Sequence, residues 1–296
     1  MGGEGDMADD NTLSRRWLGN ARVRLAVTTG RGPRVVWWGW RDGDNLFAEL
    51  PDLTRETPDG VYHFLGGHRL WYAPEVLTRT YWPDDAPPAV ADVPGGARFT
   101  APPDGAGIVK ELTIALDGDE PAALVRHTLR NAGRWPVELA PWALSMCRPG
   151  GVALLPQPRE PADPDGLLPN RRFVFWPYSD PADRRFHLGS RVALVRGEPG
   201  PNNKLGYLNH DGWLAYWLDG TLFSRRYDPH PDAAHPDTGC NAECYLHDRF
   251  VEVEALGPLV RLAPGAAIHH DETWRLHANV PPVPDEAAAV ALAARL

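Results

Sequence analysis

Short runs of β-branched and aromatic residues follow one another along the chain, and Gly, Pro, Asp or Asn separates each run from the next. Runs of this length between turn-forming residues are typical of β-strands. The last stretch, residues 284–296, instead has the pattern of a helix, with Pro284 and Asp285 suited to its start. We expect strands within residues 23–29, 33–40, 110–116, 122–131, 137–146, 173–178, 191–197, 212–218, 221–227, 249–256 and 272–280.

This succession of strands predicts an all-β protein. We expect two large antiparallel sheets packed face to face in a single domain over residues 13–296. No change of composition marks a second domain, and no repeat of fixed period is present. Residues 1–12 contain Gly, Asp and Glu and little that a core could bury, which predicts a disordered leader.

The segment 249–256, RFVEVEAL, alternates apolar and acidic residues. Because successive side chains of a strand point to opposite faces, Val251 and Val253 share one face, and Glu252 and Glu254 share the other. Two interpretations are open at this point. The two glutamates lie on an ordinary solvated face of the sheet, or they lie in a groove where carboxylates do chemistry.

Charge and cysteine content narrow the possible partners. The net charge is −9 and the arginines are scattered, whereas nucleic acid and anionic membranes require clustered Lys and Arg, so we expect neither partner. No apolar run reaches the ~18 residues of a membrane span, and the first residues are too polar for a signal peptide. Three cysteines, Cys147, Cys240 and Cys244, leave at least one unpaired and suit a reducing compartment. We therefore expect a cytoplasmic protein.

Three blocks of sequence carry a family resemblance. In the last block, Glu254 is followed by the Leu-x-Pro-Gly turn at 262–265 and by a closing strand that ends ETWRL. An early block, FLGGHRLWYAPE, contains Arg69, and a central block, VRHTLRNAGRWPVELAPWALSM, has Asn131 and Gly133 at its hairpin. Together, and in this order, the blocks resemble the aldose 1-epimerase (galactose mutarotase-like) superfamily over residues 20 to 278.

The resemblance implies a β-supersandwich with a sugar groove, and an isomerase that opens and closes a pyranose ring at the anomeric centre. In such a mutarotase a glutamate removes the anomeric hydroxyl proton and a histidine protonates the ring oxygen. Glu254 matches the position of the base. A carboxylate that aromatic walls partly desolvate has a raised pKa and can exchange protons near neutral pH, as general acid-base catalysis requires.

The sequence departs from the family at the acid. Trp142 occupies the place of the usual histidine, and an indole cannot donate a proton to a ring oxygen as an acid. His68 is the predicted substitute because it precedes Arg69, and His63 is a reserve. The departure leaves alternatives open: a carbohydrate-binding protein of this fold without turnover, or a sugar lyase or epimerase that uses the same groove.

The predicted ligand is a small carbohydrate. Arginine binds sugar hydroxyls, and aromatic faces stack on sugar C–H groups. The predicted binding residues are Arg69, Trp71, Trp82, Trp142, Asn241, Glu243 and Glu252. For the tryptophans the alternative role is core packing, and for Asn241 and Glu243 it is turn formation after Gly239.

The sequence predicts no cofactor and no metal. Motifs of nucleotide binding and of serine hydrolases are absent. Residues 230–247 are rich in His and Cys, but Cys240 and Cys244 are spaced along a predicted strand rather than around a closed loop, so a zinc site is not expected there.

Overall fold

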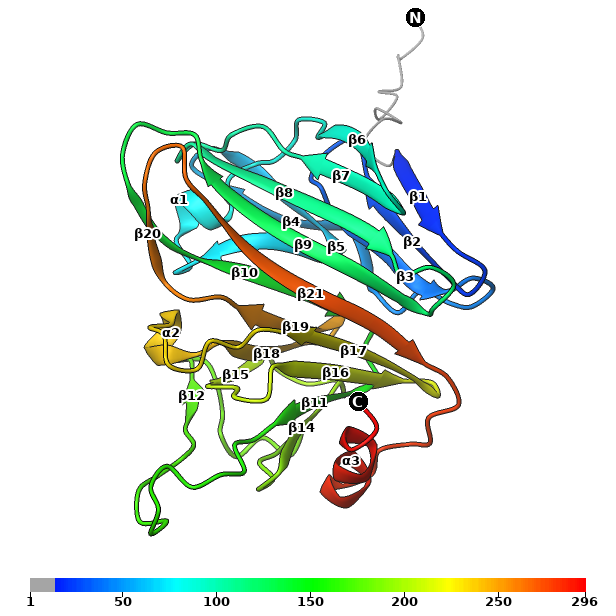
Figure 1. The fold of residues 1–296 in the computed structure, drawn as a ribbon, viewed down its shortest axis with the longest axis vertical. Helices are drawn as coiled ribbons and strands as arrows, with labels where there is room; N and C mark the ends of the chain where they lie inside the picture. Colours follow the sequence, from blue (N-terminus) through cyan, green and yellow to red (C-terminus); the bar gives the residue numbers. More distant parts are fainter. Residues whose placement is uncertain (1–13) are drawn as a thin grey trace, which may run out of the picture.

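The computed structural model describes residues 14–296, and the leader predicted at 1–12 lies outside them. Within the described residues, the strands form two antiparallel sheets, of eleven and ten strands (Figure 1). The prediction of an all-β fold with two large sheets is confirmed.

The first sheet runs in the order β1-β2-β3-β5-β10-β19-β18-β15-β12, with β4 paired to β5 and β20 paired to β10. Its strands are β1 (Arg15–Gly19), β2 (Val23–Thr28), β3 (Val35–Trp40), β4 (Glu49–Thr57), β5 (Gly60–Ala73), β10 (Val137–Cys147), β12 (Phe173–Phe175), β15 (Asn203–Tyr207), β18 (Ala242–His247), β19 (Phe250–Leu256) and β20 (Val260–Leu262).

The second sheet runs in the order β13-β14-β11-β16-β17-β21-β9-β8-β7-β6. Its strands are β6 (Ala89–Val93), β7 (Gly96–Thr100), β8 (Ile108–Leu116), β9 (Ala122–Asn131), β11 (Val152–Pro156), β13 (Phe186–His187), β14 (Val192–Arg196), β16 (Trp213–Leu218), β17 (Thr221–Tyr227) and β21 (Ala267–His277).

The main core lies between the two sheets. Val251 and Val253 of β19 pack in one cluster with Phe223 of β17 and Trp274 of β21. These side chains are almost fully buried. The alternation predicted for residues 249–256 is therefore present, because the valines face the second sheet while Glu252 lies on the opposite face, where it lines a cavity.

Helices are short and lie at the edges of the sheets. They are α1 (Leu77–Thr80), α2 (Pro236–Gly239) and α3 (Glu286–Ala293). The carboxylate of Asp285 accepts a hydrogen bond from the backbone N–H of Ala288 at 2.9 Å, so the predicted start of the terminal helix is confirmed. Helix α3 packs through Ala289 and Leu292 on β11, β14 and β16, beside which it is drawn in red (Figure 1). No helix in residues 14–296 has the length and apolar character needed to cross a membrane.

All eleven predicted strand segments contain an observed strand, but the longest strand was not predicted. Strand β5 spans residues 60–73, and its backbone takes positive φ at Leu65, Gly66 and Gly67. A Cβ on Gly67 would stand 2.1 Å from the carbonyl oxygen of Val35, so glycine is required where β5 approaches β3. Strand predictions rest on runs of β-branched and aromatic residues, and Gly66 and Gly67 interrupt such a run within β5.

Candidate functional site

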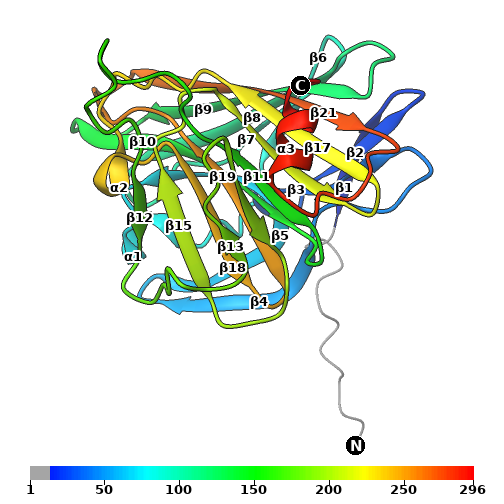
Figure 2. The same cartoon turned by 90° about the horizontal axis from the view of Figure 1, so that it is seen from below.

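Five neighbouring strands of the first sheet, β5, β10, β19, β18 and β15, position the candidate site (Figure 2). Their register aligns Arg69 with Leu144, Leu144 with Glu254, and Glu254 with Glu243. Residues that pair across adjacent strands share a face. Three charged residues far apart in the sequence therefore stand in one row across the sheet.

A second row runs parallel to the first. It aligns Met146 with Glu252, Glu252 with Tyr245, and Tyr245 with Lys204. This row lies two residues along each strand from the first, so its side chains emerge on the same face. The face carries Lys204, Arg69 and three glutamates within two adjacent rows.

A cavity of about 500 Å³ opens over these rows, on the face turned away from the second sheet. Four of the predicted binding residues line it together: Arg69, Trp71, Trp142 and Glu252. The charged and titratable lining residues are Arg55, Arg69, Glu75, Lys204, His247 and Glu252. The aromatic lining residues are Phe64, Trp71, Tyr81, Trp142, Trp176, Tyr178, Tyr245 and Phe250.

Arg69 and Glu252 form an ion pair at the floor of this cavity. Nη2 of Arg69 donates to Oε1 of Glu252 at 2.7 Å, and the guanidinium lies 4.1 Å from the ring centroid of Trp71. Burial raises the pKa of Glu252 to about 7, although the charge of Arg69 opposes the shift. This carboxyl group can therefore gain or lose a proton near neutral pH at the cavity surface.

Lys204 forms a second charged centre. Its Nζ lies 2.6 Å from the carboxylate of Glu243 and 3.0 Å from that of Glu254. Burial alone would lower the pKa of Lys204, but Glu243 and Glu254 outweigh burial and raise it well above its ordinary value. The ammonium is therefore charged at neutral pH, and it stands 4.9 Å and 4.6 Å from the ring centroids of Trp142 and Trp176.

Glu254, the predicted base, lies beneath the surface of the cavity and does not line it. The carboxylate is fully buried, and its Oε2 accepts hydrogen bonds from the indole Nε1 of Trp142 at 2.8 Å and from Lys204. These two side chains line the cavity in front of it. Glu254 and the equally buried Glu243 form ion pairs with Lys204, and neither lines the cavity. Of the two glutamates on β19, Glu252 is the one at the cavity surface.

The structure places His68, the predicted acid, in the core and not at the cavity. Neighbours on a strand face opposite ways, so His68 points into the core while Arg69 points into the cavity. His68 Nε2 lies 2.7 Å from His127 Nε2, and His68 Nδ1 lies 2.9 Å from Ser145 Oγ. His127 Nδ1 faces the carbonyl oxygen of His270 and so carries the hydrogen, which makes His68 the donor to His127.

Two other predicted residues lie outside the cavity. Trp82 lines a separate hollow of about 110 Å³ beside Pro83 and Asp84. Asn241 is fully buried, and its amide nitrogen donates to the carbonyl oxygens of Asn209 and Pro229, both at 2.8 Å. Asn241 therefore joins two loops that lie far from it in sequence.

The residue that the sequence reading missed is Lys204. It lies on β15, whose sequence NKLGY contains no β-branched or aromatic run. The composition nevertheless distinguishes Lys204. The chain has 28 arginines and two lysines, so a lysine at this position departs from its usual choice of cation. Gly206 on the same strand has a steric role, since a Cβ there would stand 2.7 Å from Sγ of Cys240.

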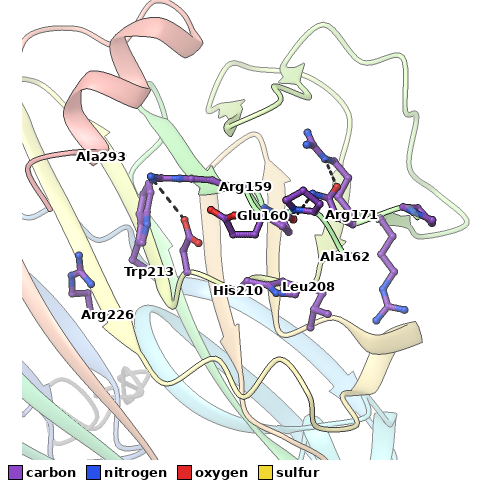
Figure 3. Close-up of a pocket in the computed structure, with 15 residues that line it drawn as sticks. Arg159, Glu160, Ala162, Arg171, Leu208, His210, Trp213, Arg226 and Ala293 are labelled. Atoms are coloured by element: carbon purple, nitrogen blue, oxygen red, sulfur yellow. Dashed lines mark hydrogen bonds and ion pairs between the residues drawn. The ribbon is translucent and has the colours of Figure 1, made fainter. Parts of the chain in front are cut away.

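A larger hollow lies elsewhere on the molecule. It measures about 820 Å³ and is bounded by the segment 158–172, Trp213 and α3 (Figure 3). Arg159 lies alongside Trp213 and pairs with Asp211 at 3.9 Å, while Arg171 donates to the carbonyl oxygen of Ser190 at 2.8 Å. These arginines point in different directions and do not converge on a ligand position (Figure 3).

The His- and Cys-rich segment 230–247 is accounted for by local contacts. His235 has both ring nitrogens within 3.2 Å of backbone carbonyl oxygens, those of Gly257 and His230. Cys240 and Cys244 are free and buried. Over residues 14–296, no group of three or more His, Cys, Asp and Glu side chains is arranged to hold a metal ion.

Known proteins match this chain in structure but not in sequence. No family profile matches the sequence, and no curated protein matches it. The Slr1438 protein from Synechocystis is 10% identical with a TM-score of 0.55, over 94% of this chain and 100% of that one. A galactose mutarotase-like protein from Lactobacillus casei is 12% identical with a TM-score of 0.53, over 89% and 100%.

A protein from Escherichia coli K12, named as a candidate aldose 1-epimerase, is 11% identical with a TM-score of 0.55, over 90% of this chain and 99% of that one. At 10–12% sequence identity these matches show a shared fold, and the shared fold covers nearly the whole length of each chain. The chain therefore has the β-sandwich fold of the aldose 1-epimerase and galactose mutarotase-like structures.

Proposed function

We propose that the protein binds a small carbohydrate or sugar derivative in the cavity over Arg69 and Glu252, and that it acts there as a mutarotase-like isomerase. The observation that carries the proposal is Glu252, a carboxyl group at the cavity surface with a pKa of about 7. A general base works best when its pKa lies near the operating pH.

The lining of the cavity supports a sugar as ligand. Trp176, which is partly exposed, and Tyr178, which is exposed, line the cavity and offer aromatic faces on which the C–H groups of a pyranose stack. Arg69 has a buried Nε without a hydrogen-bond partner, in addition to the nitrogen that holds Glu252. Apolar walls with a few charged groups are the usual composition of a small-molecule site.

Glu252 is the proposed proton acceptor because of the charge balance around it. Three carboxyl groups, Glu243, Glu252 and Glu254, share two cations, Lys204 and Arg69. Burial raises the pKa of Glu243 well above its ordinary value and that of Glu252 to about 7, and of these two groups Glu252 is the one that lines the cavity. In the proposed step, ionised Glu252 accepts the anomeric hydroxyl proton while the bond between the anomeric carbon and the ring oxygen breaks.

A second candidate function is carbohydrate binding without turnover. It is favoured by Trp142, which stands where the resemblance expects the acid histidine, and which donates its indole N–H to Glu254. That contact, together with Lys204, covers the carboxylate that the family would use as base.

Polarimetry of freshly dissolved α-D-glucose and α-D-galactose tests the proposal. The wild-type protein should accelerate mutarotation, and Glu252→Gln should reduce the acceleration by at least about 100-fold, the contribution typical of general base catalysis. A wild-type protein that is stabilised by a sugar but leaves the optical rotation on its spontaneous course would favour the second candidate. No acceleration and no stabilisation would contradict both.

We further propose that residues 13–296 act as one domain in the cytoplasm. A continuous core between the two sheets supports the first point. Three free, buried cysteines, Cys147, Cys240 and Cys244, support a reducing compartment.

A further inference from the structure

We propose that Lys204 is a catalytic residue that donates a proton to the ring oxygen of the sugar. This inference rests on the proposed function, because ring opening needs a proton donor as well as the acceptor Glu252. The expected histidine position holds Trp142, and His68 is in the core. Lys204 lies over the ring of Trp142, at 4.9 Å from its centroid, and so occupies the space in front of the missing histidine.

The ammonium of Lys204 makes one hydrogen bond, to Oε2 of Glu254, and one ion pair, with Glu243. A lysine ammonium has three donors. Among the described residues, two acceptors lie within 3.0 Å of Nζ, the carboxylates of Glu243 and Glu254. Lys204 is 4% exposed and lines the cavity, so its remaining N–H can point into the cavity and donate to a ligand there. The rings of Trp142 and Trp176 flank the ammonium and confine it.

The two buried glutamates explain why a lysine stands at this position. A neutral polar side chain at position 204 would not compensate for negative charge on Glu243 and Glu254. The single ammonium of Lys204 contacts both carboxyl groups. Burial raises the pKa of Glu243 well above its ordinary value, and perturbed titratable groups beside a cavity are typical of functional sites. The chain otherwise uses arginine almost throughout, and Lys110 is its other lysine. Unlike a guanidinium, an ammonium can release a proton and take it back.

The proposed step balances in protons and electrons. Glu252 removes the proton of the anomeric hydroxyl, and a carbonyl forms at the anomeric carbon. The bond from that carbon to the ring oxygen breaks, and its electron pair goes to the oxygen, which receives a proton from Lys204. An alkoxide is a stronger base than an ordinary lysine amine and so can take this proton, while Glu243 and Glu254, which raise the pKa of Lys204, oppose the transfer.

Ring closure reverses each transfer. After rotation about the bond between the first and second carbons, the hydroxyl attacks the other face of the carbonyl. Its proton returns to the amine of Lys204, which Glu243 and Glu254 favour because they stabilise the ammonium. Glu252 returns its proton to the anomeric oxygen. The product is the other anomer, and the protein is restored.

Substitutions at Lys204 test the inference by polarimetry and sugar-induced change in melting temperature. Lys204→Arg keeps a positive charge beside Glu243 and Glu254, so it should fold and bind sugar, but a guanidinium does not give up its proton. We expect it to lose the acceleration by at least about 100-fold. Lys204→Met should lose it as well. The matched control is Lys110→Met, which lies by Asp104 outside this cavity and should keep the wild-type rate.

The outcomes separate this inference from the proposed function. Wild-type acceleration that persists in Lys204→Arg overturns the role of Lys204 and leaves the isomerase proposal intact. Loss of the rate in His247→Gln with no loss in Lys204→Arg would assign the donor to His247, which also lines the cavity. If the wild-type protein binds sugar and accelerates nothing, the catalytic role of Lys204 falls together with turnover, and binding alone remains.

The pH profile gives an independent readout. With Lys204 as donor, the accelerated rate should rise as the pH increases through about 7, where Glu252 ionises, and stay level to pH 9. A histidine donor would make the rate fall above about pH 6.5, where an ordinary imidazole loses its proton. A falling limb in that range would overturn the inference.

Discussion

Arg69 and Glu252 form a buried ion pair across two strand boundaries, with Arg69 Nη2 at 2.7 Å from Glu252 Oε1. Arg69 lies on β5, Glu252 lies on β19, and β10 runs between them. The side chain of Arg69 is 1% exposed and that of Glu252 is 9% exposed. The pair therefore links the central strands of the first sheet under the cavity, and the charge of Arg69 offsets part of the rise that burial causes in the pKa of Glu252.

Removal of one partner should be costly. We expect Arg69→Met to lower the free energy of unfolding by about 3 kcal/mol, because it leaves Glu252 buried without its cation. Denaturant unfolding measures the change. The matched control is Arg126→Met, which breaks an ion pair to Asp271 whose side chains are more than half exposed. That control should cost less than about 1 kcal/mol. Equal costs for the two variants would contradict the structural role of the Arg69 pair.

Trp142 should be important for stability through its indole N–H. Trp142→Phe keeps an aromatic ring but removes the donor to Glu254, so we expect a loss of about 2 kcal/mol in the free energy of unfolding. Trp135→Phe is the control, because Trp135 is 78% exposed. Its effect should stay within about 0.5 kcal/mol. If Trp142→Phe is as stable as the control, the hydrogen bond to Glu254 does not contribute.

The buried histidines should make the protein sensitive to acid. Burial lowers the pKa of His127 to about 4 and that of His68 well below its usual value. The unfolded state binds protons near pH 6.5 and the folded state does not, so their contribution is complete above pH 6.5 and is lost as the pH falls. For His127 alone the loss should reach about 3 kcal/mol by pH 4.

Glu252 should act in the opposite direction. Its folded pKa of about 7 lies above the ordinary value of 4.5, so protonation stabilises the folded state as the pH falls from 7 to 4.5. Glu252→Gln removes this compensation. We expect its free energy of unfolding to fall by about 3 kcal/mol more than that of the wild type over this interval. Parallel pH curves for the two proteins would show that the pKa of Glu252 is ordinary.

Chelation should leave the protein unchanged. The ring nitrogens of His235 face backbone carbonyl oxygens, and Cys240 and Cys244 are buried thiols whose pKa is raised by burial. We expect the same melting temperature before and after treatment with EDTA, measured by differential scanning fluorimetry. A lower melting temperature that added zinc restores would contradict this prediction.

Much of the fold could be predicted because its strands carry the usual signals. In β19 the alternation of Val251 and Val253 with Glu252 follows directly from the two faces of a strand. Strand β15 shows the limit of this reasoning. It pairs with β12 and β18 in the sheet, but its sequence NKLGY contains one residue typical of strands, Tyr207, and no run of them.

The site was predicted only in part, and for a physical reason. His68 and Arg69 are adjacent, so once residues 60–73 form a strand they must face opposite ways, and only one of them can line the cavity. Because residues 60–73 were not predicted to be a strand, His68 and Arg69 were both predicted to face the sugar. Which of Glu252 and Glu254 reaches a ligand depends on Lys204, which covers Glu254, and no local pattern in the sequence reports that contact.

The central claim is that the cavity over Arg69 and Glu252 binds a sugar. It is tested most directly by melting the protein with a panel of hexoses and pentoses, in free, phosphorylated and oxidised forms. A ligand at about 100 times its dissociation constant adds roughly 2.7 kcal/mol to the stability of the native state. We predict a sugar that raises the melting temperature of the wild type and of Arg126→Met by several degrees, and not that of Arg69→Met. An equal rise in Arg69→Met, or no rise with any sugar, would contradict the claim.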